Sequence, residues 1–197
     1  MPDSRGDPLA LAWRAGLPVE FLYLSEAFPR HRWSEAGLHP TARRWLHMHD
    51  GFRAHQAQME AMIGVWRAGR VDVRTLHDGL IPSLQQFLQH LDGHHRIESG
   101  HYFPALQRLE PRIAAGIDLL DRDHEAIHQH IEAMVGTGRA LHGAVAGGAA
   151  DAADRVERLA EALGLAAPEL ARHLDDEEDI VIPLIALRGD PLGSSQG

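Results

Sequence analysis

The sequence of 197 residues contains no cysteine and no lysine. Without cysteine the chain has no disulfide framework, no thiolate zinc site, no cysteine-ligated iron–sulfur cluster and no thiol nucleophile, so a metal site must use nitrogen and oxygen ligands. The 19 basic residues are all arginines, scattered among 28 acidic residues, and the net charge is −9. Because such a chain presents no basic patch to a phosphate backbone, we expect no nucleic-acid partner.

Long apolar runs and a secretory leader are also missing. The longest aliphatic run, residues 180–187, is far shorter than the ~20 residues that span a bilayer, and it contains a proline. The N-terminus carries an acidic residue early and no clean apolar stretch follows it, so no signal peptide is indicated. We therefore expect a soluble, cytoplasmic protein that does not associate with membranes.

Histidine, by contrast, is abundant, with 15 residues in a chain of otherwise ordinary composition. Apolar residues make up 44% of the sequence, which is enough for a well-buried core and excludes a disordered chain. The length and composition together predict one main domain.

Four long segments repeat apolar residues in steps of three and four, which is the pattern of helices that bury one face. No alternating strand pattern competes with them. The segments run over residues 45–66, 84–102, 120–135 and 156–184.

Glycine and proline mark the ends of these segments. Gly69 closes the first, residues 104–111 end the second, and the glycine- and alanine-rich residues 143–150 separate the third from the fourth. Pro82 and Pro168 lie inside helical patterns, where we expect a kink or a restart of the helix. Short connections between four such helices favour an all-α fold, an up-down-up-down four-helix bundle.

The chain divides into three expected regions. Residues 1–40 hold several aromatic and aliphatic side chains and are expected to form an N-terminal extension that packs on the bundle. Residues 41–188 are expected to form the four-helix domain, and residues 189–197 a flexible tail.

Histidine and carboxylate side chains fall on the apolar faces of all four predicted helices. Residues four apart lie about 40° apart around a helix and one turn apart along it, so they share a face. A His–Glu pair with this spacing occurs on the second and the fourth helix, a His–His pair on the third, and a single histidine on the first. These seven candidate ligands are His49, His94, Glu98, His124, His128, His173 and Glu177.

The chain also contains an internal repeat. Histidine, glutamate and proline keep the same spacing in residues 94–104 and in residues 173–183, and a shift of the first helix by 75 residues places His49 on His124. A site between the two related helix pairs would be pseudo-symmetric.

A pair of metal ions accounts for this set of inward polar side chains. An unpaired ionised group in the interior costs several kcal/mol, so five imidazoles and two carboxylates at similar depth need a shared compensation. Imidazole and carboxylate together suit iron, manganese or zinc. Seven ligands exceed what one ion usually takes, whereas two ions bridged by two glutamates would use them all.

In these motifs the chain resembles the hemerythrin-like, HHE cation-binding family over roughly residues 41–188. The resemblance implies a four-helix bundle with a non-haem di-iron centre, five histidines and two bridging carboxylates. Carried onto this chain, the resemblance implies that three histidines hold one iron and two histidines hold the other, and that two glutamates bridge the two ions. The iron with two histidines would keep an open position for dioxygen or a related small oxidant such as peroxide. The assignments are His124, His128 and His173 for the first iron, His49 and His94 for the second, and Glu98 and Glu177 for the bridges.

The sequence departs from the oxygen-carrying members of the family at the second bridge. Those members place an aspartate five residues after the histidine, where this chain has Glu178, but the internal repeat favours Glu177. Additional histidines and aspartates lie near the predicted site. His90 and His101 are candidates for outer-sphere partners or alternative ligands, whereas His95 is expected on the surface or rim. The two aspartates are Asp50 and Asp123, which could orient a bound imidazole.

The resemblance favours a protein that binds metal and dioxygen over an enzyme, and it names no protein partner. Two alternatives stay open. A plain metal-binding or interaction module would hold zinc or one iron without a redox role, and a haem held by two histidines is also conceivable. A ferritin-like di-iron oxidase would need Glu-x-x-His motifs on two helices. The chain contains two such motifs, Glu98 to His101 and Glu125 to His128, but on adjacent predicted helices.

Overall fold

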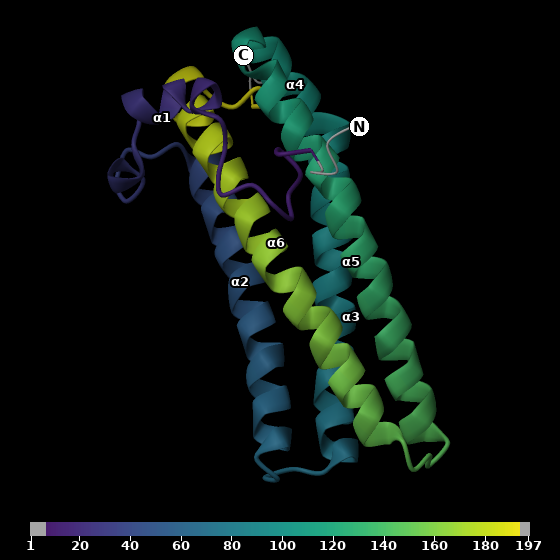
Figure 1. Cartoon of the computed structure of the whole chain (residues 1–197). Helices are drawn as coiled ribbons and strands as arrows, with labels where there is room; N and C mark the ends of the chain where they lie inside the picture. Colours follow the sequence, from purple (N-terminus) through teal and green to yellow (C-terminus); the bar gives the residue numbers. More distant parts are fainter. Residues whose placement is uncertain (1–6, 194–197) are drawn as a thin grey trace, which may run out of the picture. The chain divides into compact units, whose positions relative to one another are not determined.

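A computed structural model describes residues 7–193, which are helical or irregular and include no strand (Figure 1). The all-helical class predicted from the sequence is therefore confirmed. Residues 1–6 and 194–197, which belong to the expected N-terminal extension and tail, lie outside the described residues. No helix within the described range is long and apolar enough to cross a membrane.

Four long helices account for the four predicted segments. Three of them extend beyond their segments at both ends, whereas the second starts earlier than predicted and ends at Ile97. The four helices are α2 (Pro40–Arg67), α3 (Val73–Ile97), α5 (Ala114–Ala146) and α6 (Ala152–Arg188). Neither Pro82 nor Pro168 restarts its helix, because α3 and α6 continue through them. Favourable packing on both sides of a proline can outweigh the one hydrogen bond that it removes.

The ends of the helices follow the predicted glycine signals. Gly69 adopts a φ of 68°, the left-handed conformation that glycine tolerates best. Its N–H donates to the carbonyl of Trp66 at 2.8 Å, and the N–H of Arg70 donates to that of Val65 at 3.2 Å. These bonds satisfy carbonyls at the end of α2 that would otherwise lack a donor.

The predicted second helix changes its geometry near its end. After Ile97 the chain continues as a π-helical segment, Glu98–Tyr102, and then as the short helix α4 (Phe103–Leu109). Pro104 has no N–H to give to the carbonyl one turn earlier and its ring would clash with that carbonyl, so a wider turn accommodates it. Glu98 is the first residue of the widened turn, a type of distortion that is frequent at functional sites.

The N-terminal region contains three short elements, a 3-10 helix Val19–Phe21, α1 (Tyr23–Ala27) and a 3-10 helix Arg30–Arg32. Its apolar side chains share a buried core with the start of α2, with α4 and with the end of α6. Examples are Leu24, Phe28 and Trp33, which cluster with Trp45, Leu106, Ile180 and Ile185.

The described residues form two compact units through which the four long helices pass. The first unit comprises the chain up to His49, His95–Ala126 and the chain from Glu169. The second comprises Asp50–His94 and Ile127–Pro168. In the second unit the rings of Phe52 on α2 and Phe87 on α3 meet edge to face, with centroids 6.2 Å apart.

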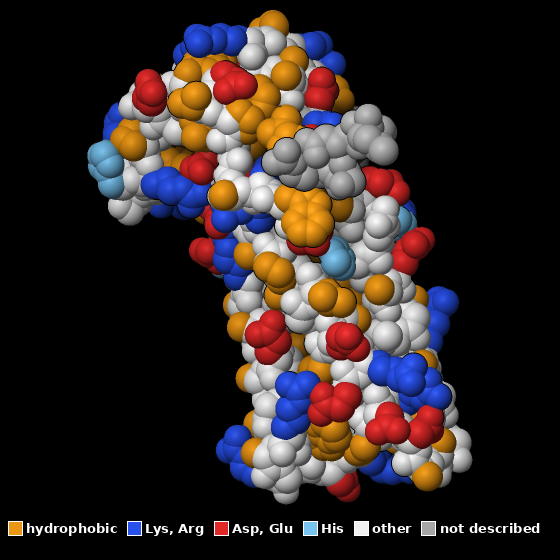
Figure 2. Space-filling model, viewed as in Figure 1, with side chains coloured by type: hydrophobic (Ala, Val, Ile, Leu, Met, Phe, Trp, Pro, Cys, Tyr) orange, Lys and Arg blue, Asp and Glu red, His pale blue; other side chains and the backbone are white. Residues whose placement is uncertain are grey.

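Acidic and arginine side chains are interspersed on the surface. On the face in view, red and blue side chains alternate without a broad area of either sign (Figure 2). One exposed ion pair of this kind joins Arg67 on α2 to Glu157 on α6 in the second unit.

Candidate metal centre

Seven buried histidine and glutamate side chains form two groups. Within each group, one ligand atom from every residue lies within 4.8 Å of the others. The first group is His95, His124 and His173, and the second is His49, His94, Glu98 and Glu177.

Glu177 faces histidines of both groups. Its Oε2 lies 3.2 Å from Nε2 of His173, one turn earlier on α6, and its Oε1 lies 3.4 Å from Nε2 of His49 on α2. A carboxylate that directs one oxygen to each group has the arrangement required of a bridging ligand. Glu98 has a similar place, because its Oε2 lies 3.6 Å from Nε2 of His124, a residue of the other group.

The outer nitrogen of His49 is held by a second carboxylate. Its Nδ1 lies 3.0 Å from Oε1 of Glu178, so an Nδ1–H donates there and Nε2 is directed to the group. The adjacent residues Glu177 and Glu178 of α6 thus differ in position. Glu177 belongs to the second group, whereas Glu178 contacts the outer nitrogen of His49. The indole N–H of Trp45 also donates to Oε1 of Glu177.

His124 is oriented in the same way by a hydroxyl. The Oγ of Ser99 lies 2.9 Å from Nδ1 of His124 and donates its own hydrogen to Oδ1 of Asp121 at 2.5 Å. A hydroxyl that donates to the carboxylate accepts from the imidazole, so Nδ1 carries the proton and Nε2 offers its lone pair to the group. The ring of Phe103 stacks on His124, with centroids 5.3 Å apart.

His173 has an aspartate behind it. Its Nδ1 lies 3.6 Å from Oδ2 of Asp123, which is buried. Burial favours the neutral acid, but the hydrogen bonds from Arg14 and the nearby imidazole of His173 outweigh it and lower the pKa of Asp123 below its ordinary value. Asp123 is therefore a carboxylate, as an orienting partner of a metal-bound imidazole must be.

The pKa values of His49 and His124 are shifted in opposite directions. Burial opposes the charged form of His49, yet Glu177 and Glu178 outweigh it and raise its pKa to about 9. Burial, together with the neighbouring His173, lowers the pKa of His124 to about 4. At neutral pH His124 is thus a neutral donor, whereas His49 carries a proton that a metal ion would displace.

The two buried glutamates also differ. Burial and the neighbouring Glu177 raise the pKa of Glu98 well above its ordinary value. Burial acts in the same sense on Glu177, but the pKa of Glu177 lies well below its ordinary value because His49 and His173 stabilise its charge. Two carboxyl groups at this depth repel each other when both are ionised, and cations between them would remove the conflict.

The structure passes a direct test of fit for such cations. The Nε2 atoms of His124 and His173 and the Oε2 of Glu177 are buried and make no hydrogen bond to any residue within 7–193. Buried polar atoms in proteins nearly always have a partner. Imidazole nitrogens and carboxylate oxygens are ligands for iron, manganese and zinc, and coordination would satisfy all three atoms.

Residues 41–185 match the hemerythrin HHE cation-binding domain, a range that includes both groups of ligands. The chain belongs to this family. No curated protein and no solved structure matches the sequence.

Six of the seven candidate ligands of this HHE domain lie in the two groups, but His128 does not. The expectation that His128 faces the interior is wrong, since its side chain is 49% exposed and lies 3.5 Å from Glu132 on the same helix. The buried face of α5 is centred near Leu120 and Ile131, and at about 100° per residue His124 stands about 40° from Leu120 whereas His128 stands about 80° from it. His128, four residues after His124, therefore lies outside the buried face of α5.

His95 occupies the place expected for His128. The expectation that it lies on the surface or rim is wrong, because it is 7% exposed and its ring stacks on His124 with centroids 4.1 Å apart. The signal was present in the sequence, since Leu88 lies seven residues earlier on the same side of the helix and is apolar. Two adjacent histidines of the HHE domain, His94 and His95, therefore lie one in each group.

The other neighbouring candidates of the HHE domain point to solvent. His90, His101 and Asp50 are exposed, which leaves them outside the site. The ferritin-like alternative also loses its motifs, because His101, Glu125 and His128 are all exposed.

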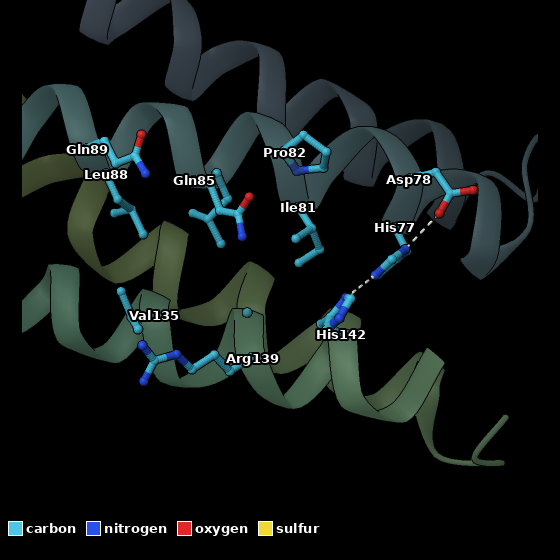
Figure 3. Close-up of a pocket in the computed structure, with 12 residues that line it drawn as sticks. His77, Asp78, Ile81, Pro82, Gln85, Leu88, Gln89, Val135, Arg139 and His142 are labelled. Atoms are coloured by element: carbon cyan, nitrogen blue, oxygen red, sulfur yellow. Dashed lines mark hydrogen bonds and ion pairs between the residues drawn. The ribbon is translucent and has the colours of Figure 1, made fainter. Parts of the chain in front are cut away.

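A separate cavity of about 780 Å³ lies in the second unit of the HHE domain, between α3 and α5 (Figure 3). Its lining includes Ile81, Gln85 and Arg139, and none of the seven grouped ligands. At one end Nε2 of His77 lies 3.0 Å from Nδ1 of His142. Because its lining shares no residue with the two groups, the cavity is distinct from the candidate metal centre.

Proposed function

We propose that this HHE domain is a non-haem di-iron protein that binds or responds to dioxygen or related small oxidants. The observation that carries the proposal is the position of Glu177, with one oxygen 3.4 Å from His49 and the other 3.2 Å from His173. A second carboxylate, Glu98, is buried beside it. Two carboxylates between two sets of imidazoles favour a bridged pair of ions over a single ion.

The ligand assignment follows from the two groups. His95, His124 and His173 would hold one ion, His49 and His94 the other, and Glu98 and Glu177 would bridge them. The ion with two histidines has fewer protein donors, which leaves coordination room for a small ligand. The helices would follow the up-down-up-down topology of the family's bundle, with the ligands projecting inward.

Iron would supply reversible exchange between the ferrous and ferric states together with affinity for dioxygen. The chain supplies a site that favours a small neutral ligand over water. The ring of Phe52 lies against His94, with centroids 5.2 Å apart, and Phe103 lies against His124. Trp45 donates to Glu177 from the buried side of α2, which fixes that carboxylate. Apolar rings beside the imidazoles limit access of water to the centre.

Metal analysis combined with optical spectroscopy tests the proposal. The metal-free protein is reconstituted with ferrous iron without oxygen, iron per chain is measured, and spectra are recorded before and after oxygen is admitted. Two ions per chain and new charge-transfer absorption from a bridged ferric pair are expected. Fewer than one iron per chain, or a featureless spectrum at full iron loading, would contradict it.

The competing proposal is a metal-binding module without a redox role, filled by zinc or manganese. It rests on the same ligands, because imidazole and carboxylate do not select one of these metals. Two bound zinc ions per chain after purification from cells, with no iron uptake by the metal-free protein, would favour it. A Soret band in the purified protein would instead indicate haem.

A further inference from the structure

Arg14 is a buried arginine in the N-terminal region, outside the part of the chain that matches the family. Its side chain is 2% exposed. The turn that carries it is fixed by its own backbone, with the N–H of Arg14 donating to the carbonyl of Ala10 at 3.1 Å, and by the buried side chain of Leu11. The guanidinium is therefore held in one place.

The guanidinium binds two buried carboxylates that adjoin ligands of the metal centre. Both terminal nitrogens of Arg14 donate to Asp123, one of them at 2.8 Å to Oδ1, and Nε donates to Oδ2 of Asp176 at 2.8 Å. A further bond runs from Nη1 to the carbonyl of Leu9 at 2.9 Å. Asp123 precedes His124 in the chain, and Asp176 precedes Glu177.

Asp123 connects the guanidinium of Arg14 to the candidate metal centre. Its Oδ2 accepts a hydrogen bond from Arg14 and also lies 3.6 Å from Nδ1 of His173. His173 belongs to the first group, His95, His124 and His173, which we call the three-histidine group. A carboxylate held by a bidentate arginine has little freedom to rotate, so the imidazole that it faces is fixed as well. The order of contacts is thus Arg14, Asp123, His173.

We propose that Arg14 is a positioning residue of the metal centre, holding Asp123 against His173 so that the three-histidine group is aligned to receive its ion. The inference rests on the proposed function, since it assumes that this group holds metal. It assigns the N-terminal region a part in the site, because the guanidinium that binds Asp123 lies outside residues 41–185. Lysine cannot take the same place, because an ammonium has no planar fork to bind both oxygens of Asp123 together with Asp176.

Cobalt(II) titration of the metal-free protein tests this inference, because the visible bands of cobalt(II) report histidine coordination without redox chemistry. The unmodified chain is expected to bind two cobalt ions, and His95→Ala identifies which of the two belongs to the three-histidine group. Arg14→Gln and Asp123→Asn are each expected to weaken binding at that group by roughly 10- to 100-fold and to leave the other ion unchanged. In the double variant the two losses should not add, because Arg14 acts through Asp123.

Controls separate positioning from a general effect on folding. Arg67→Gln removes an exposed ion pair in the second unit by the same substitution and should leave both affinities unchanged. Thermal unfolding of each metal-free variant is recorded in parallel. Arg14→Lys keeps the positive charge but loses the planar guanidinium, so it should also weaken binding only of the ion at the three-histidine group. If Arg14→Gln does not fold, Arg14→Lys provides the test.

The outcomes distinguish the inference from the proposed function. If the unmodified chain binds no cobalt at the three-histidine group, the proposed function fails and the inference with it. If two ions bind but the Arg14 variants change both affinities equally or neither, the inference alone is overturned. Additive losses in the double variant would also overturn it, because they would show that Arg14 does not act through Asp123.

Discussion

Oε1 of Glu177 lies 3.4 Å from Nε2 of His49, and both side chains are fully buried. The contact joins α6 to α2 at a depth where an unbalanced charge would be costly. In the absence of metal the pair is balanced by a proton on His49, whose pKa is raised to about 9. Proton and metal ion therefore compete for the same place.

Metal uptake at neutral pH should release protons. Because His49 is protonated below pH 9 and must be neutral to coordinate, the apparent affinity should rise about tenfold per pH unit up to pH 9 for each proton displaced. Above that pH the contribution of His49 should vanish. Zinc titrations of the metal-free protein in weakly buffered solution, with a pH indicator, measure the released protons. An affinity that does not change between pH 7 and pH 9 would contradict the raised pKa.

Loss of a buried ligand should prevent full metal loading. His124→Ala removes a nitrogen of one group and Glu98→Ala removes an expected bridge, so both variants should hold fewer ions per chain after reconstitution and desalting. His31→Ala and His142→Ala change exposed histidines and should load like the unmodified protein. Elemental analysis gives the number of ions, and equal loading in all four variants would show that the assigned centre is wrong.

A matched pair of histidine variants separates the ligand set predicted from the sequence from the one that the two buried groups indicate. His95→Ala should lose the ion of the three-histidine group, because His95 lies in that group. His128→Ala should keep it, since that side chain is 49% exposed. Metal content and the cobalt(II) spectrum of both variants are the measurements. The opposite result would mean that α5 turns on binding metal to bring His128 inward.

The two adjacent glutamates on α6 should differ in their effects. Glu177→Gln removes a carboxylate that faces both groups, so the chain should fail to retain two ions. Glu178→Gln leaves the ligand atoms in place but weakens the hold on Nδ1 of His49, and it should lower the metal affinity by roughly 10- to 100-fold while two ions still bind at saturation. Isothermal titration with zinc distinguishes lost stoichiometry from lost affinity. Retention of two ions by Glu177→Gln would point to Glu178 as the bridge.

The helices could be predicted from the sequence because their signals are local. Apolar steps of three and four define a buried face wherever they persist, and Gly69 ends α2 as expected from its freedom at positive φ. The π-helical turn at Glu98 was not predicted, because apolar spacing does not distinguish a widened turn from a regular one.

The candidate site was predicted in part, for a related reason. Residues near the middle of a buried face, such as Glu98, were placed correctly. His128 was expected inside because an apolar pattern does not define how far a buried face extends, whereas His95 was expected outside although Leu88, on the same side of its helix, indicated burial. Arg14 was missed altogether, since its partner Asp123 lies 109 positions away and a single arginine in a loop carries no periodic signal.

The internal repeat gives the two halves of the centre different chemistry at one position. The spacing that aligns His94 with His173 aligns His95 with Leu174, which is buried. One half thus offers an additional nitrogen where the other offers only a hydrocarbon side chain. Because His95 joins His124 and His173 of the other half, one group has three imidazoles and the other has two. Two ions bound there would be unequal, and under a chelator the ion with fewer nitrogen donors should leave first, so the centre would empty through a half-filled state.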